Sequence, residues 1–96
     1  GNPVGAEEAL RLGLVNSVVP AADLLPAAER MARAIASKSR PAVRLALAAV
    51  QSSAELPLKE GQQNEARLFG ASCATEDFRE GTRAFLEKRT AVFRSP

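Results

Sequence analysis

Four stretches of helical periodicity, separated by residues that interrupt helices, set the strongest limit on how this chain can fold. Three of them carry a proline in the first turn, at Pro26, Pro41 and Pro57, where its missing amide hydrogen does no harm. Asp23 suits the N-cap of the first stretch and Thr75 that of the fourth. Apolar residues recur within the stretches at three- and four-residue intervals. We therefore predict helices over residues 24–36, 41–53, 57 to between 70 and 74, and 76–89.

The residues before these stretches predict less regular structure. Residues 6–12 are good helix formers and stop at Gly13, a residue type that tolerates a left-handed cap. Residues 14–19 are rich in β-branched side chains and end at Pro20, which predicts an extended segment or a short edge strand. One strand cannot build a sheet. The predicted fold class is therefore all-α, with four main helices plus one short extended segment, the first two main helices forming an antiparallel hairpin.

Composition narrows the class of protein further. A chain of 96 residues is enough for one small domain, so we predict a single domain over residues 1–96. A net charge of +2 is too small to indicate nucleic-acid binding, and the chain has no Tyr or Trp to stack on bases. No apolar run approaches the length of a membrane span. We predict no nucleic-acid partner and no membrane association.

The chain has no histidine, which excludes Ser-His and Cys-His nucleophile arrangements within it. Cys73 is the only cysteine, so neither an internal disulfide nor a Cys/His zinc site can form. We predict no metal site, a small buried packing role for Cys73, and a reducing, cytoplasmic location.

The carboxylates predict structural roles rather than catalysis. Neighbouring acidic residues on a helix diverge by about 100° and do not converge on one substrate atom, so Glu7 and Glu8 suit a solvated first turn. Three acidic residues open the last predicted helix, as helix-start charges and partners of Arg79 or Arg83. They are Glu76, Asp77 and Glu80.

Three residues inside predicted helices invite a packing explanation. Glu65 lies in an otherwise apolar stripe, where a buried carboxylate should be paired, so we predict a structural ion pair for it. Gly61 and Gly81 each cost about 1 kcal/mol relative to alanine in a helix, which predicts that another helix approaches closely there.

Several of these segments together resemble a known family. Residues 75–81 (TEDFREG) followed by 84–89 (AFLEKR) resemble the C-terminal helix of the enoyl-CoA hydratase/isomerase (crotonase) superfamily. The resemblance extends back through residues 6–9 (AEEA), 13–16 (GLVN) and 41–44 (PAVR), and so covers essentially the whole chain. The chain resembles only the C-terminal, helical portion of such an enzyme.

The resemblance implies where the chemistry lies. In this superfamily a preceding spiral of strands and helices carries the oxyanion-hole amides and both catalytic glutamates, and the C-terminal helices assemble a trimer that often pairs to a hexamer. We accordingly assign no catalytic residue to this chain, expect no cofactor besides a coenzyme A thioester as substrate, and expect a homo-oligomer. Phe69 and Lys88 match the family positions that approach the adenine and phosphate end of coenzyme A, commonly that of a neighbouring subunit.

The function implied is that of a C-terminal fragment of an enoyl-CoA hydratase, inactive by itself, whose parent adds water to a trans-2-enoyl-CoA. Leu47, Gln62 and Phe78 depart from common family residues, so the reaction within the superfamily stays open. The alternative is a standalone helical interaction or oligomerisation module without an enzymatic role. That alternative rests on apolar stripes that exceed what a small bundle can hide.

Overall fold

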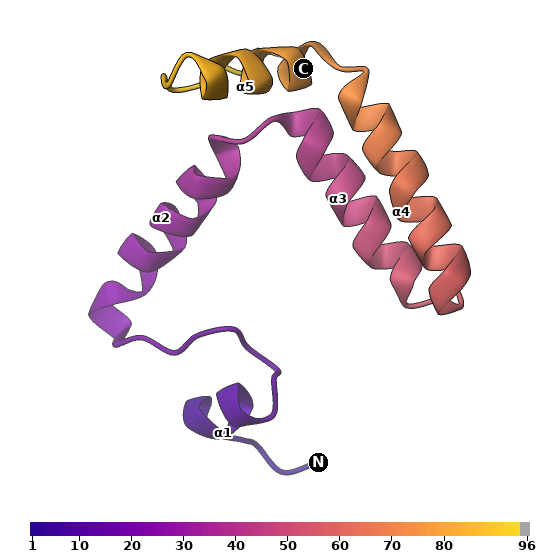
Figure 1. The fold of residues 1–96 in the computed structure, drawn as a ribbon. Coiled ribbons are helices and arrows are strands. Elements are labelled where there is room, and N and C mark those ends of the chain that lie inside the picture. The colour runs from indigo at the N-terminus through magenta and orange to yellow at the C-terminus, as the bar shows by residue number, and fades with distance from the viewer. Residues whose placement is uncertain (95–96) are drawn as a thin grey trace. The chain divides into compact units, whose positions relative to one another are not determined.

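The computed structural model describes residues 1–94, and these contain helices and connecting segments but no strand. The predicted all-α fold class is confirmed (Figure 1). The elements are α1 (Ala6–Arg11), a 3-10 turn η1 (Ala21–Asp23), α2 (Leu24–Ala36), α3 (Arg40–Ser53), α4 (Leu58–Cys73) and α5 (Glu76–Leu86). Among the described residues, no helix combines the length and apolar character needed to cross a lipid bilayer.

The chain divides into two compact units, one over Gly1–Arg33 and the other from Ala34 onward. The first contains α1, η1 and most of α2. The second contains α3, α4 and α5, and the candidate site lies within it.

In the first unit, α1 ends as the sequence predicts. Gly13 takes a left-handed conformation with φ 73°. Its N–H donates to the Leu10 carbonyl at 3.0 Å, and the Leu14 N–H donates to the Ala9 carbonyl at 2.9 Å. These two bonds form a Schellman motif, which satisfies carbonyl groups at the helix end. On the same helix Glu8 is paired with Arg11 at 2.6 Å, and this guanidinium lowers the pKa of the Glu8 carboxyl.

The segment between α1 and α2 contains no strand, which leaves the extended segment of the two predicted alternatives. Residues 14–16 form bends and residues 17–20 have no regular secondary structure. Asp23 is the last residue of η1, which continues directly into α2, so the predicted N-cap role is wrong. The helical backbone begins earlier, after Pro20, and Asp23 therefore lies within it.

In the second unit, α3 packs side by side with α4 (Figure 1). Asn64 of α4 donates from Nδ2 to the Ser52 Oγ of α3 at 2.8 Å, and Leu68 of α4 is buried. The predicted hairpin between residues 24–36 and 41–53 joins the two units, and it stays a prediction. Ser39, in the connection before α3, is the buried N-cap of that helix and accepts the Ala42 N–H at 3.3 Å.

The start of α5 agrees with its sequence signals, whereas its end does not. Thr75 is the N-cap and accepts the Phe78 N–H on Oγ1 at 3.1 Å. The helix stops at Leu86, so Lys88 and Arg89 lie beyond it rather than in its last turn.

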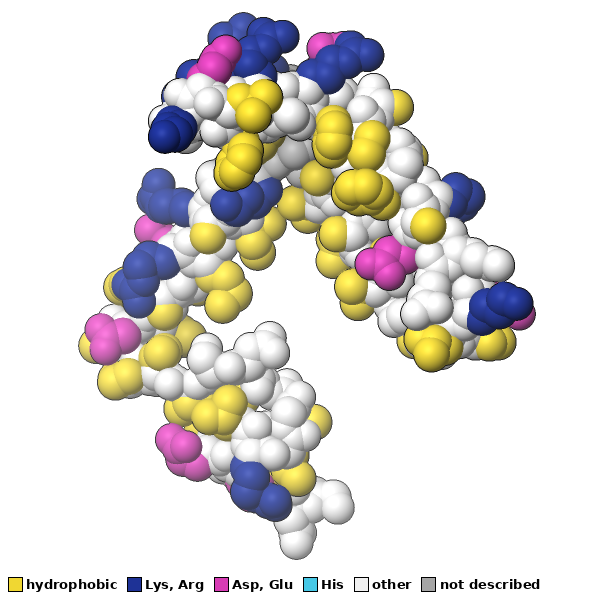
Figure 2. All heavy atoms as spheres, in the orientation of Figure 1, with side chains coloured by type: hydrophobic (Ala, Val, Ile, Leu, Met, Phe, Trp, Pro, Cys, Tyr) yellow, Lys and Arg dark blue, Asp and Glu magenta, His cyan; other side chains and the backbone are white. Residues whose placement is uncertain are grey.

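Few apolar side chains are buried within this single chain. Leu68 and Ala84 are the buried apolar residues of the described part, whereas Leu58 is 79% exposed and Phe85 82% exposed. Figure 2 shows apolar side chains on the visible surface of α3 and α4. Many apolar side chains of the stripes predicted from the sequence are thus exposed in residues 1–94.

Candidate functional site

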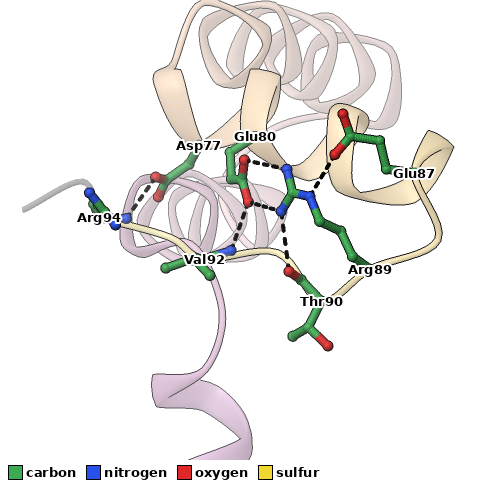
Figure 3. Close-up of polar contacts among 7 residues, drawn as sticks. All are labelled: Asp77, Glu80, Glu87, Arg89, Thr90, Val92 and Arg94. Atoms are coloured by element: carbon green, nitrogen blue, oxygen red, sulfur yellow. Dashed lines mark hydrogen bonds and ion pairs between the residues drawn. The ribbon is translucent and has the colours of Figure 1, made fainter.

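The most highly organised polar structure lies where the chain turns back along α5 after its end. We call residues 87–94 the return segment. The Arg89 guanidinium binds both carboxylate oxygens of Glu80, with Nη1 to Oε1 at 2.6 Å and Nη2 to Oε2 at 3.0 Å (Figure 3). Glu80 Oε1 also accepts the Val92 N–H at 2.9 Å. One carboxylate therefore holds the return segment by a side chain and by the backbone.

A second carboxylate of α5 holds the return segment further along. Asp77 is 3% exposed, and its Oδ1 accepts the Arg94 N–H at 3.3 Å. Between these attachments the Phe93 ring lies over Gly81, 3.6 Å from where a β-carbon would stand. Asp77 and Glu80 are three residues apart and so lie on the same side of the helix.

The turn between α5 and the return segment repeats the geometry found at the end of α1. The Lys88 N–H donates to the Phe85 carbonyl at 3.2 Å, and the Arg89 N–H donates to the Ala84 carbonyl at 3.0 Å. Lys88 takes the left-handed position with φ 53°. It is the one positive-φ residue other than glycine in residues 1–94.

The electrostatics of this turn favour the charged forms of both partners. Hydrogen bonding to Arg89, reinforced by the Val92 N–H, lowers the pKa of Glu80 from 4.5 to about 2. Glu80 and then Glu87, which accepts from Arg89 Nε at 2.6 Å, raise the pKa of the Arg89 guanidinium. The carboxylate of Glu80 therefore stays ionised well below neutral pH.

Acid should loosen the return segment over a defined range. Because the pKa of Glu80 is lowered in the folded chain, its contribution to stability is complete above pH 4.5 and is lost as the pH falls toward about 2. We expect the Val92 amide resonance to move in that range, since its acceptor becomes protonated. The Glu80→Gln variant should show no such titration, whereas a wild-type midpoint near 4.5 would contradict the assignment.

The ion pairs predicted at the start of the last helix are confirmed in one case and wrong in another. Glu76 pairs with Arg79 as predicted. Glu80 pairs with Arg89, nine residues later, and not with Arg79 or Arg83. Asp77 is buried rather than a solvated helix-start charge. The return segment is the physical reason for both differences, since it covers this side of α5.

A hollow of about 670 Å³ adjoins these residues. Its lining carries both signs of charge, and it consists of Glu76, Asp77, Arg79, Glu80, Arg83, Arg89, Val92 and Arg94. With its carboxylates in contact with arginines, the hollow offers no carboxylate pair placed for acid–base work.

The two residues predicted to approach coenzyme A lie on different elements. Phe69 is in α4 and 64% exposed. Lys88 is exposed and stands in the turn after α5. Neither side chain lines the hollow. Within one chain, Phe69 and Lys88 therefore do not share a site with the hollow.

Other single-residue predictions also have clear outcomes. Glu65 is exposed on α4 and forms no ion pair among the described residues, so the expected pairing is wrong. A β-carbon at Gly61 would meet no atom within 4 Å outside its own helix, and one at Gly81 would meet Phe93 of the return segment, so no second helix explains either glycine. Cys73 is half-buried rather than fully buried. Residues 1–94 contain no cluster of three metal-ligating side chains.

Sequence reasoning missed the Glu80–Arg89 pair and the left-handed Lys88. Both depend on the chain reversing after Leu86, and no glycine marks that reversal. The sequence feature closest to the reversal is the run of ionisable residues at positions 87–89, from which we predicted a cationic helix end.

Comparison with known proteins places the chain in a family. The sequence model of the enoyl-CoA hydratase/isomerase family matches residues 1–96. The crotonyl-CoA hydratase of Syntrophomonas wolfei is 45% identical over 90 residues, which are 94% of this chain and 35% of that protein. The mitochondrial enoyl-CoA hydratase of Pongo abelii is 37% identical over 94 residues, which are 98% of this chain and 32% of that protein. The chain belongs to the enoyl-CoA hydratase/isomerase family.

Solved structures agree with that assignment. The crystal structure of enoyl-CoA hydratase from Bacillus anthracis matches with a TM-score of 0.89 and 38% identity, covering 95% of this chain and 35% of that one. The chain spans about a third of the length of the curated relatives it matches.

Proposed function

We propose that this chain is the C-terminal portion of an enzyme that adds water across the double bond of a trans-2-enoyl-CoA thioester. The proposal rests on one observation above all: the similarity to enoyl-CoA hydratases runs through the whole chain while spanning about a third of their length. The exposed apolar faces of α3, α4 and α5 support it, because they are suited to further protein surface.

The chemistry would belong to the rest of the enzyme. In the family that this chain resembles, two glutamates handle the water and the proton while two backbone amides hold the thioester oxygen. Such preorganised donors stabilise the charge that develops in the transition state. These 96 residues would supply helical packing, contacts in a homotrimer or hexamer, and part of the coenzyme A rim. The single cysteine suits the reducing cytoplasm, and that location stays a prediction.

Within that rim, Phe69 and Lys88 are the residues we propose to meet coenzyme A. Phe69 presents 64% of its surface, so an aromatic face is free to stack near a purine. Lys88 is exposed at the turn, and its ammonium is a compact charge suited to a phosphate. In an oligomer, Phe69 and Lys88 would contact the coenzyme A of a substrate bound in a neighbouring subunit.

The test uses a hydratase-length protein that ends in these 96 residues. Lys88→Gln should raise the KM for crotonyl-CoA about tenfold and leave kcat nearly unchanged, because a charge-assisted contact to a phosphate is lost. The KM for crotonyl-pantetheine, which lacks the adenosine phosphates, should not change. Lys59→Gln, at another exposed lysine, is the matched control. An unchanged KM for crotonyl-CoA in Lys88→Gln would contradict the rim assignment.

A standalone helical oligomerisation module is the second candidate. It is favoured by the same exposed apolar residues, Leu25, Leu58 and Phe85 among them. Light scattering on the separated chain distinguishes the cases. Discrete closed oligomers with stable helices would support the module, whereas concentration-dependent association without a fixed size agrees with missing enzyme surface.

A further inference from the structure

We infer that Glu80 and Arg89 are positioning residues that fix the turn presenting Lys88, so that its ammonium is held ready for the phosphate end of coenzyme A. The inference rests on the proposed function of Lys88. The inference adds that the end of α5 and the return segment together hold the Lys88 turn in place.

The position of Lys88 is fixed from both sides. Before it, α5 closes with the Lys88 N–H on the Phe85 carbonyl and the Arg89 N–H on the Ala84 carbonyl. After it, the Arg89 side chain binds both oxygens of Glu80, at 2.6 and 3.0 Å. A bidentate pair between a guanidinium and a carboxylate sets orientation as well as distance. The backbone of Lys88 therefore has little freedom to swing.

The identity of the residue at this turn also requires an explanation. A left-handed residue at the end of a helix is usually glycine, because a β-carbon is strained there. The same motif at the end of α1 has Gly13, whereas here the position is Lys88. The Lys88 side chain forms no hydrogen bond or ion pair with any residue among 1–94. Since no residue among 1–94 uses the ammonium, a partner in another molecule accounts for it.

The rest of the return segment prevents the turn from opening. Glu80 also accepts the Val92 N–H, and the buried Asp77 accepts the Arg94 N–H (Figure 3). Phe93 packs on Gly81 between these bonds. Ordering this backbone before substrate arrives reduces the conformational entropy that binding would otherwise cost.

The pairing of Glu80 serves Lys88 in a second way. The carboxylates near the turn, Glu80 and Glu87, both contact Arg89 at 2.6 Å. With their charge offset by the guanidinium, they compete less for the neighbouring ammonium. Lys88 is thereby left available to an anion from another molecule.

The experiment compares two glutamates of α5 in the hydratase-length protein. Glu80→Gln should raise the KM for crotonyl-CoA about threefold with kcat unchanged, since binding and not chemistry depends on the turn. The KM for crotonyl-pantetheine should stay constant. Glu76→Gln is the matched control. Like Glu80, Glu76 pairs with an arginine, but that arginine is Arg79 of the same helix, and the pair holds no part of the return segment. Arg89→Gln should reproduce Glu80→Gln.

Double variants show whether Glu80 acts through Lys88. In the Lys88→Gln background, Glu80→Gln should add no further change in KM. Full additivity, or an equal effect on both thioesters, would overturn the positioning role. If Lys88→Gln itself has no effect, the proposed coenzyme A contact fails. If Lys88→Gln weakens binding while Glu80→Gln and Arg89→Gln do not, only the positioning role fails.

Discussion

The separated 96-residue chain is expected to leave crotonyl-CoA unhydrated, at the level of a heat-treated sample. It has no histidine, and five of its glutamates, Glu8, Glu29, Glu76, Glu80 and Glu87, are paired with arginines. General acid–base catalysis and an oxyanion hole each contribute about 10²-fold or more to rate, and in the function proposed above both belong to the preceding part of the enzyme. The loss should therefore exceed about 10⁴-fold relative to a hydratase-length protein.

The measurement is the disappearance of the enoyl thioester under matched chain concentrations. The positive control is the same 96 residues joined to the preceding part of a related hydratase. Hydration by the separated chain that survives repeated purification and is lost on heating would overturn the division of labour proposed above.

Replacing Phe85 by serine should prevent assembly of the hydratase-length protein while leaving the separated chain almost unchanged. The side chain is 82% exposed, so the single chain loses little packing. Serine and phenylalanine have similar helix propensities, so α5 itself should persist. If an oligomer covers the ring, each copy loses about 1.5–3 kcal/mol of burial. A trimer loses that amount three times over and should dissociate at working concentrations.

Multi-angle light scattering measures the assembly, and circular dichroism of the separated chain measures its helicity. Phe85→Leu keeps an apolar side chain and should retain the oligomer. Equal oligomer mass for the serine and leucine variants would show that Phe85 remains uncovered in the assembly.

Local features of the fold were predictable because local residues determine them. Thr75 caps α5 with its own hydroxyl, and Gly13 supplies the left-handed residue that closes α1. Both effects act within a few residues of chain. The packing of α4 on α3 was not predictable in this way. It depends on contacts such as Asn64 with Ser52, twelve residues apart.

The candidate site was even less predictable from local sequence than the fold. Composition and periodicity indicated solvated charges around residues 76–89, and only the resemblance to a family drew attention to Phe69 and Lys88. The Glu80–Arg89 pair requires knowing that the chain reverses after Leu86. The reversal places Lys88 rather than a glycine in a left-handed conformation, and this has an energetic cost. An argument from residue propensities would therefore disfavour a reversal at this position.

The left-handed Lys88 has a practical consequence for anyone engineering this protein. A screen for heat resistance would select Lys88→Gly, because glycine relieves about 1 kcal/mol of backbone strain at such a position. The selected variant would denature at a higher temperature and, if the proposed contact holds, saturate only at higher thioester concentrations. Thermostability and affinity would then be traded against each other at a single residue.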